Sequence, residues 1–138
     1  RSFAVRLLAM LHLGFVWLGV GWLLSGMQGL LHTAGITVLG LAPLHALAVG
    51  YFATMTVAMV SRVTLGHSGR PLVADTLTWS LALGLHAVAF VRLLADLLPT
   101  GQAFLLALAG VGWLAVFTPL AMRVVPIYLS RRADGKAG

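Results

Sequence analysis

Four long apolar stretches, separated by short polar or glycine-rich connections, dominate the chain. They cover about residues 3–24, 36–63, 73–97 and 104–124. A helix needs roughly 20 apolar residues to cross a bilayer, and each stretch reaches that length. The pattern predicts an all-α integral membrane protein, a four-transmembrane-helix bundle forming one domain over residues 1–138, with a polar tail over 125–138. Pro43 is expected to bend the first turns of the second helix.

The basic residues divide unevenly between the two ends of such a bundle. One end carries only Arg92. The other end collects eight basic residues, namely Arg1, Arg6, Arg62, Arg70, Arg123, Arg131, Arg132 and Lys136. Lys and Arg are in excess in the cytoplasmic loops of membrane proteins. Both termini, including the tail, are therefore predicted to be cytoplasmic.

The composition supports a membrane protein and argues against a nucleic-acid partner. Hydrophobic residues make up 60% of the chain, charged residues 9%, and the mean hydropathy is +1.01. A soluble domain usually carries about a quarter charged residues. The net charge of +6 is best explained by membrane orientation. The expected partner is the lipid bilayer, with other transmembrane subunits or a second copy of the chain as open alternatives.

Histidine is the best metal ligand that this sequence offers. The chain has no cysteine, which excludes disulfides, iron–sulfur clusters and thiolate-bound metals. His12, His45 and His86 fall inside predicted spans, where a polar side chain is costly unless something satisfies it. His67 lies in the connection after the second span, and His32 in the one before it. An intramembrane histidine either binds a metal centre or donates a hydrogen bond to a neighbouring helix.

The positions of these histidines suggest two sites. His45 precedes Arg62 by seventeen residues, roughly 25 Å of helix, and His86 follows Leu72 by fourteen, roughly 21 Å. The two are therefore expected at similar depth, as opposed axial ligands of a haem, because neutral imidazole suits iron. His12 lies nearer the basic end. With His67 it is a candidate ligand for a second haem or a copper ion.

Arg92 and the connection around His67 each have two interpretations. Arg92 follows His86 by six residues and could pair with a haem propionate. The alternative, an ion pair with Asp96 at i,i+4, is slightly favoured. In the segment 65–72 (LGHSGRPL), exposed amides could hold an anion beside Arg70, or the segment is simply a sharp turn.

Several motifs resemble those of one known family. Residues 11–18 (LHLGFVWL) resemble the pattern LHLGYxWL, and residues 44–50 (LHALAVG) resemble LHALxxG. Residues 55–72 (MTVAMVSRVTLGHSGRPL) resemble MTLAVMxRxxLGHTGRPL, and the end of the chain resembles P…PRxDGxPG. Together these motifs resemble the NnrS family over nearly the whole chain. Family members are longer, and the likeness is to their C-terminal part, so a fragment, a short paralogue or a subunit of an assembly is expected.

The resemblance implies a multi-pass protein of the bacterial inner membrane that contains haem and copper and is linked to denitrification and nitric oxide tolerance. His12, His45 and His67 match the family motifs, whereas His86 lies outside them. The leading prediction is a protein that binds haem b, with copper as a second expected metal, in nitric oxide response or membrane redox chemistry. Whether it is an enzyme stays open. The alternatives are a non-catalytic transmembrane subunit of a larger respiratory or photosynthetic complex, and a small transporter module.

Overall fold

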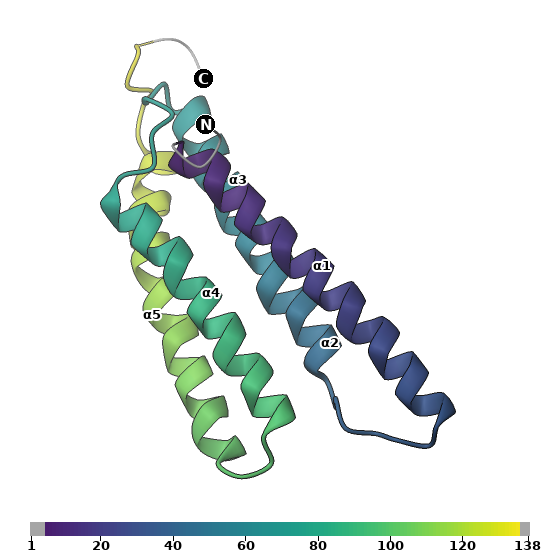
Figure 1. Ribbon diagram of the computed structural model, residues 1–138. Coiled ribbons are helices and arrows are strands. Elements are labelled where there is room, and N and C mark those ends of the chain that lie inside the picture. The colour runs from purple at the N-terminus through teal and green to yellow at the C-terminus, as the bar shows by residue number, and fades with distance from the viewer. Residues whose placement is uncertain (1–4, 136–138) are drawn as a thin grey trace.

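The computed structural model describes residues 5–135 as four long helices joined by short connections (Figure 1). The elements are α1 (Arg6–Thr33), a composite second helix made of α2 (Ala42–His45), η2 (Ala46–Ala53) and α3 (Thr54–His67), then α4 (Thr76–Leu97) and α5 (Gln102–Leu129). No strand occurs within this part of the chain. All four helices are long and apolar enough to cross a membrane. The predicted all-α membrane fold with four spanning helices is therefore confirmed.

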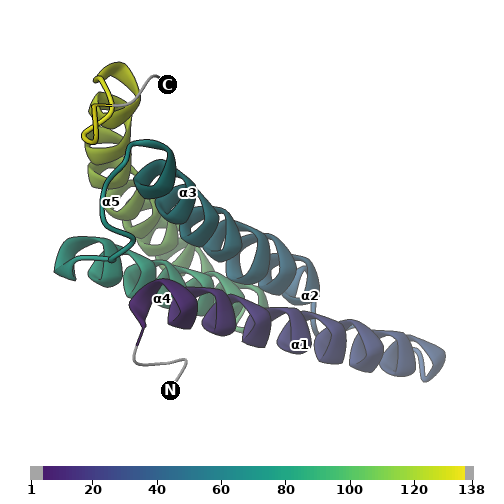
Figure 2. The same cartoon turned by 90° about the horizontal axis from the view of Figure 1, so that it is seen from above.

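The helices form two antiparallel hairpins that lean against each other (Figures 1 and 2). α1 packs along the composite helix, and α4 packs along α5. α4 makes most of the contacts between the hairpins, because it contacts α1, α2, η2 and α3, and α5 adds a smaller contact with α3. α1 and α5 do not contact each other over the described residues. The residues around α4 are therefore the main link between one hairpin and the other.

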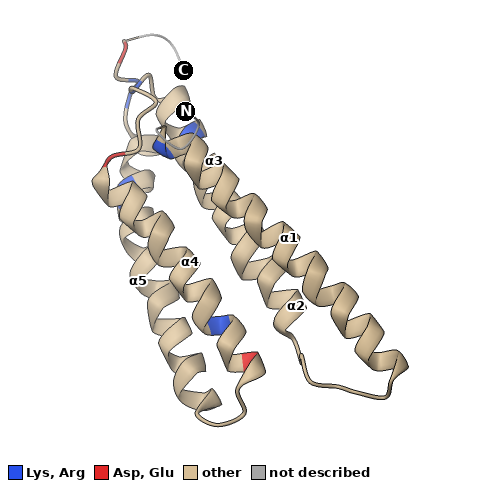
Figure 3. Cartoon of the chain, viewed as in Figure 1, with Lys and Arg blue, Asp and Glu red and all other residues tan. Residues whose placement is uncertain are grey.

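Charged residues lie mainly at one end of the bundle (Figure 3). We call it the basic end, and it carries Arg6, Arg62, Arg70, Arg123, Arg131 and Arg132. Arg1 and Lys136 lie outside the described residues. The opposite end holds two charged residues, Arg92 and Asp96, both on α4. The first and last parts of the described chain, the start of α1 and the segment after α5, both lie at the basic end (Figure 1), as an even number of spans requires. The membrane side that this end faces stays a prediction.

The first helix extends further than the sequence pattern indicated. α1 continues to Thr33, past the expected end at residue 24, so His32 lies in its last turn. The segment after residue 24 has no proline and no charge, and Ser25 donates from Oγ to the carbonyl of Gly21 at 2.8 Å. Gly35, with φ of +73°, follows the end of the helix. A left-handed glycine is a common way to end a helix.

The start of the second helix and the end of the fourth differ from the prediction, and prolines lie at both places. The second helix begins at Ala42, not at residue 36, and Pro43 lies in its first turn, where a proline starts a helix rather than bending it. α5 contains Pro119 and Pro126 and continues to Leu129, past the expected end at residue 124. Proline is tolerated in membrane helices because neighbouring groups satisfy the backbone that it frees. The tail beyond the helix is correspondingly shorter.

Candidate functional site

A histidine, an aspartate and an arginine form a hydrogen-bonded chain at the end of the bundle opposite the basic end. Nδ1 of His45 lies 2.7 Å from Oδ2 of Asp96, and Nη1 of Arg92 lies 2.8 Å from Oδ1 of the same carboxylate. The Asp96 side chain is only 6% exposed, while those of His45 and Arg92 are 18% and 20% exposed. One nearly buried carboxylate therefore serves two donors at once.

The protonation of His45 follows from its second hydrogen bond. Nδ1 also lies 3.1 Å from the backbone oxygen of Leu41. A carbonyl oxygen can only accept, so Nδ1 carries the proton and donates it to Leu41 and Asp96. In the neutral ring the lone pair is then on Nε2. Histidines that bind metals almost always donate their other ring N–H to a carboxylate or a backbone carbonyl, and His45 donates to both.

Local structure explains how His45 reaches this position. It is the fourth and last residue of α2, which begins at Ala42 beside Pro43. The chain continues directly as η2, a π-helical stretch of eight residues. π-Helical turns are rare and often occur at functional sites. Asp96 lies in the last turn of α4, one turn beyond Arg92.

The sequence indicated half of this arrangement. The i,i+4 ion pair between Arg92 and Asp96, the slightly favoured alternative, is confirmed. The pairing of Arg92 with a haem propionate stays a prediction, and Nη1 of Arg92 donates to Asp96. The contact between Asp96 and His45 was missed. The available signal was that Asp96 is one of only three acidic residues in the chain.

His86 makes a different kind of hydrogen bond. Nε1 of Trp17, on α1, donates to Nδ1 of His86, on α4, at 2.9 Å. Indole N–H is a donor only, so Nδ1 of His86 accepts and the ring proton is on Nε2. Trp17 packs directly over Gly50 of η2, where a Cβ atom would overlap its ring. In this tautomer neither ring nitrogen of His86 has a lone pair free for a metal, and the residue links α1 to α4.

The structure does not bring His45 and His86 together. His45 bonds to Asp96, which lies ten residues beyond His86 on α4, roughly 15 Å along the helix. Two axial ligands of one haem need their nitrogens only about 4 Å apart, at about 2 Å from the metal on each side. The depth estimate failed because it began α4 at Leu72. The helix starts at Thr76, so His86 is nearer the basic end than expected.

His12 and His67 are also separated. His12, an exposed residue of α1, has Nδ1 2.8 Å from the carbonyl oxygen of Leu8. His67 is the last residue of α3 and is exposed. Gly14, close to His12, lies against Met55 of α3, and His67 is twelve residues further along that helix, roughly 18 Å. Within residues 5–135 no group of three or more His, Cys, Asp or Glu side chains could hold a metal ion.

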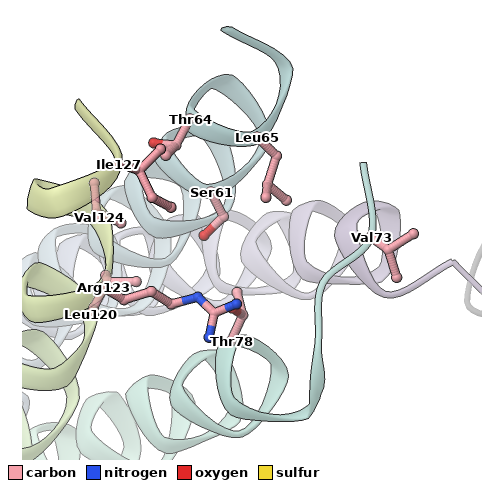
Figure 4. A pocket seen from close by; sticks show the side chains of 9 residues that line it. All are labelled: Ser61, Thr64, Leu65, Val73, Thr78, Leu120, Arg123, Val124 and Ile127. Atoms are coloured by element: carbon pink, nitrogen blue, oxygen red, sulfur yellow. The ribbon is translucent and has the colours of Figure 1, made fainter. Parts of the chain in front are cut away.

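The basic end contains a small polar pocket between α3, α4 and α5 (Figure 4). The hydroxyl of Ser61 and the guanidinium of Arg123 border a cavity of about 20 Å³, which is room for one water molecule. Ser61 Oγ is buried and has no hydrogen-bond partner among the described residues. Nη1 of Arg123 also pairs with Oδ2 of Asp75 at 2.8 Å. The pocket is too small for a haem.

Asp75 caps the start of α4 beside this pocket. Its Oδ1 accepts from the backbone N–H of Thr78 at 3.0 Å. Hydrogen bonds from the Thr78 side chain and backbone, together with Arg123, lower the pKa of the Asp75 carboxyl below its ordinary value of 3.8. Asp75 thus stays ionised at neutral pH and anchors α4 to α5.

The two motif segments at the basic end meet each other. The N–H of Ala133 donates to the carbonyl of Ser68 at 2.9 Å, and the Asp134 carboxylate lies against Gly69, where a Cβ atom would come within 2.6 Å. Arg132 donates to both oxygens of Asp134, at 3.0 and 2.7 Å. Gly69 has φ of +67°. A glycine is favoured at position 69 because its φ is positive and because a Cβ atom would collide with Asp134. The tail thereby holds in place the connection next to His67.

The comparisons identify one family. The family model described as NnrS protein matches residues 1–132, nearly the whole chain. No curated protein and no solved structure matches the chain.

Proposed function

The chain belongs to the NnrS family, whose members are membrane proteins linked to the nitric oxide response, and on this premise we propose that it binds haem b through Nε2 of His45. Asp96 orients the imidazole, and Arg92 holds Asp96. The chain is further proposed to act as a multi-pass protein of the bacterial inner membrane, with both termini in the cytoplasm. Copper binding stays a prediction from the family resemblance alone, because His12 and His67, its candidate ligands, lie far apart.

The observation that carries the proposal is the double hydrogen bond of His45 Nδ1. Its acceptors, the Leu41 carbonyl and the Asp96 carboxylate, both fix the proton on that nitrogen. The lone pair on Nε2 is then suited to iron, and a carboxylate partner makes an imidazole a stronger ligand. Arg92 compensates the charge of the carboxylate in a low-dielectric site, at 2.8 Å.

The hydrogen bond of His86 bears on whether such a haem would bind a gas or transfer electrons. Because the Trp17 N–H occupies Nδ1 of His86, this ring is not poised as a second axial ligand. If His45 were the only protein ligand, a bound ferrous haem would be able to take nitric oxide as a further ligand. A haem held by two histidines would instead favour electron transfer. The residues of this chain therefore support a role in which haem binds the gas.

Absorption spectroscopy of the full chain, purified in detergent and titrated with haem b, tests the proposal. We expect a sharp Soret band that is lost in His45→Gly and restored by added imidazole, which can enter the vacated space. His86→Ala should keep the band, and His32→Ala, an exposed residue of α1, is the matched control. The ferrous protein should shift its Soret band when nitric oxide is added.

Two outcomes would contradict the proposal. A Soret band that survives His45→Gly would place the haem ligand elsewhere in the chain. A preparation that stays colourless with added haem but copurifies with other membrane subunits would favour the accessory-subunit alternative.

A further inference from the structure

A groove with both charged and apolar walls runs beside the end of α3 at the basic end. Its volume is about 330 Å³. The side chains that form its walls come from α3, from the connection to α4 and from the tail, and they include Met59, Arg62, Val63, His67, Leu72 and Arg132. None of these residues carries a carboxylate, and the one acidic side chain that pairs with a wall residue among the described residues is Asp134, bound to Arg132. The groove is open, as the exposure of Met59, Val63 and Leu72 indicates.

Within residues 5–135 the charge balance leaves Arg62 without an acidic partner. The chain has three acidic residues, and each pairs with an arginine: Asp75 with Arg123, Asp96 with Arg92, and Asp134 with Arg132. Within residues 5–135, Arg62 makes neither a hydrogen bond nor an ion pair. An anion that pairs with its guanidinium would therefore come from outside the chain.

The position of Arg62 near the end of a spanning helix favours an anionic partner at the membrane interface. Arg62 lies five residues before the end of α3 at His67, roughly 7.5 Å below that end. A charged side chain at this depth is costly unless it reaches the membrane interface and finds a partner there. The apolar stem of an arginine can lie along apolar neighbours while its head extends to the headgroups. Met59 and Val63, one turn before and one residue after Arg62, offer that surface.

We propose that this groove binds one anionic phospholipid. The headgroup phosphate pairs with Arg62, and His67 adds a hydrogen-bond donor at the rim, as does Nη1 of Arg132, whose Nε and Nη2 are held by Asp134. An acyl chain lies against the exposed side chains of Met59 and Val63, pointing toward the middle of the bilayer. Basic pockets at the ends of membrane helices bind anionic headgroups in this way, and the apolar wall favours a lipid over a free phosphate ion.

This site is separate from the proposed haem site. Arg62 lies seventeen residues from His45 along the composite helix, roughly 25 Å, so a haem held by His45 cannot place a propionate in the groove. Loss of lipid binding and loss of haem binding can therefore be measured independently, and either proposal can fail alone.

Lipid exchange in nanodiscs tests the assignment. The full chain is placed in phosphatidylcholine nanodiscs containing a minor fraction of phosphatidylglycerol, and the lipids that remain bound after transfer to detergent are counted by native mass spectrometry. We expect phosphatidylglycerol to be enriched over its bulk fraction, and Arg62→Gln to reduce the enrichment about fivefold, the effect of one basic residue near a membrane surface. Arg131→Gln, a neighbouring exposed arginine that is not part of the groove, should leave the enrichment unchanged.

Two further measurements, and the comparison of the two arginine variants, decide between this site and its alternatives. Met59→Ser should weaken lipid retention without changing the charge. Inorganic phosphate added to pure phosphatidylcholine nanodiscs should not change the unfolding temperature, and an Arg62-dependent increase would instead indicate a general anion site and overturn the lipid assignment. Equal losses in Arg62→Gln and Arg131→Gln would mean diffuse attraction of lipid to the basic end, and would also overturn it.

Discussion

His45 and His86 lie in neighbouring spanning helices and differ in the partner of one nitrogen. Nδ1 of His45 donates to Asp96 and to the Leu41 carbonyl, whereas Nδ1 of His86 accepts from the Trp17 N–H. The first arrangement leaves a lone pair on Nε2, and the second places a proton there. The same side chain in the same kind of helix is thus prepared as a ligand in one place and as a link between helices in the other.

The comparison shows that depth in the membrane is a poor guide to what an intramembrane histidine does. The neighbour that faces Nδ1 decides the tautomer, and the tautomer decides whether the ring can bind a metal. An acceptor, such as a carboxylate or a carbonyl, prepares Nε2 as a ligand. A donor, such as an indole, prevents it.

Asp96→Asn is expected to have the largest effect on this contrast. The variant removes the charge that compensates Arg92 while keeping the shape of the side chain. Breaking a nearly buried ion pair should cost about 3 kcal/mol of stability, seen as a lower unfolding midpoint in detergent. Removing the carboxylate partner of a ligating histidine should also weaken haem binding roughly 10- to 100-fold, measured by titration.

Asp134→Asn is the control for this variant, because it also removes a carboxylate from an arginine pair but lies at the basic end. Its effect on haem affinity should be negligible. If Asp96→Asn binds haem as tightly as the unmodified protein, Asp96 does not orient the ligand, and the contrast between the two histidines loses its functional meaning.

Trp17→Phe tests the other histidine and should have a smaller effect. It removes the donor to Nδ1 of His86 and leaves that partly buried nitrogen without a partner, at a cost of about 1–2 kcal/mol. The unfolding midpoint should fall, while haem affinity should stay unchanged because His86 is not the ligand. Trp22→Phe, at an exposed indole of α1, is the matched control. Loss of the Soret band in Trp17→Phe alone would show that His86 takes part in haem binding.

The helical architecture could be predicted from the sequence, while the site could be predicted only in part. Apolar runs of spanning length fix the number of helices, since the bilayer sets that length. The ends were less predictable: α1 extends to Thr33 because nothing in its sequence stops it before Gly35, and Pro43 begins a helix that it was expected to bend. The i,i+4 pair of Arg92 and Asp96 was predictable because it depends on one helix alone.

The contacts that define the tautomers were not predictable, because they depend on how helices pack. Trp17 reaches His86 only because Gly50 leaves room for the indole ring. Asp96 meets His45 only because the composite helix starts at Ala42 and α4 starts at Thr76. Neither contact lies within a single helix, so spacing along the chain carries no signal for it.

Asp75→Asn should have the smallest effect on stability. Asp75 lies at the other end of α4 and pairs with an arginine but with no imidazole, so this variant sharpens the comparison. Asparagine caps a helix as well as aspartate does, so the variant removes charge alone. Because the side chains of Asp75 and Arg123 are 45% and 37% exposed, the loss of stability at neutral pH should be below about 1 kcal/mol.

The lowered pKa of Asp75 determines how this loss depends on pH. The stabilisation by the Asp75 carboxylate is complete above pH 3.8 and disappears as the pH falls through the folded-state pKa. The unfolding midpoints of the two proteins should therefore differ at pH 7 and converge in acid. A difference that persists in acid would assign the effect to the cap rather than to the charge. If haem affinity fell as far as in Asp96→Asn, an aspartate on α4 would affect haem binding without contacting His45.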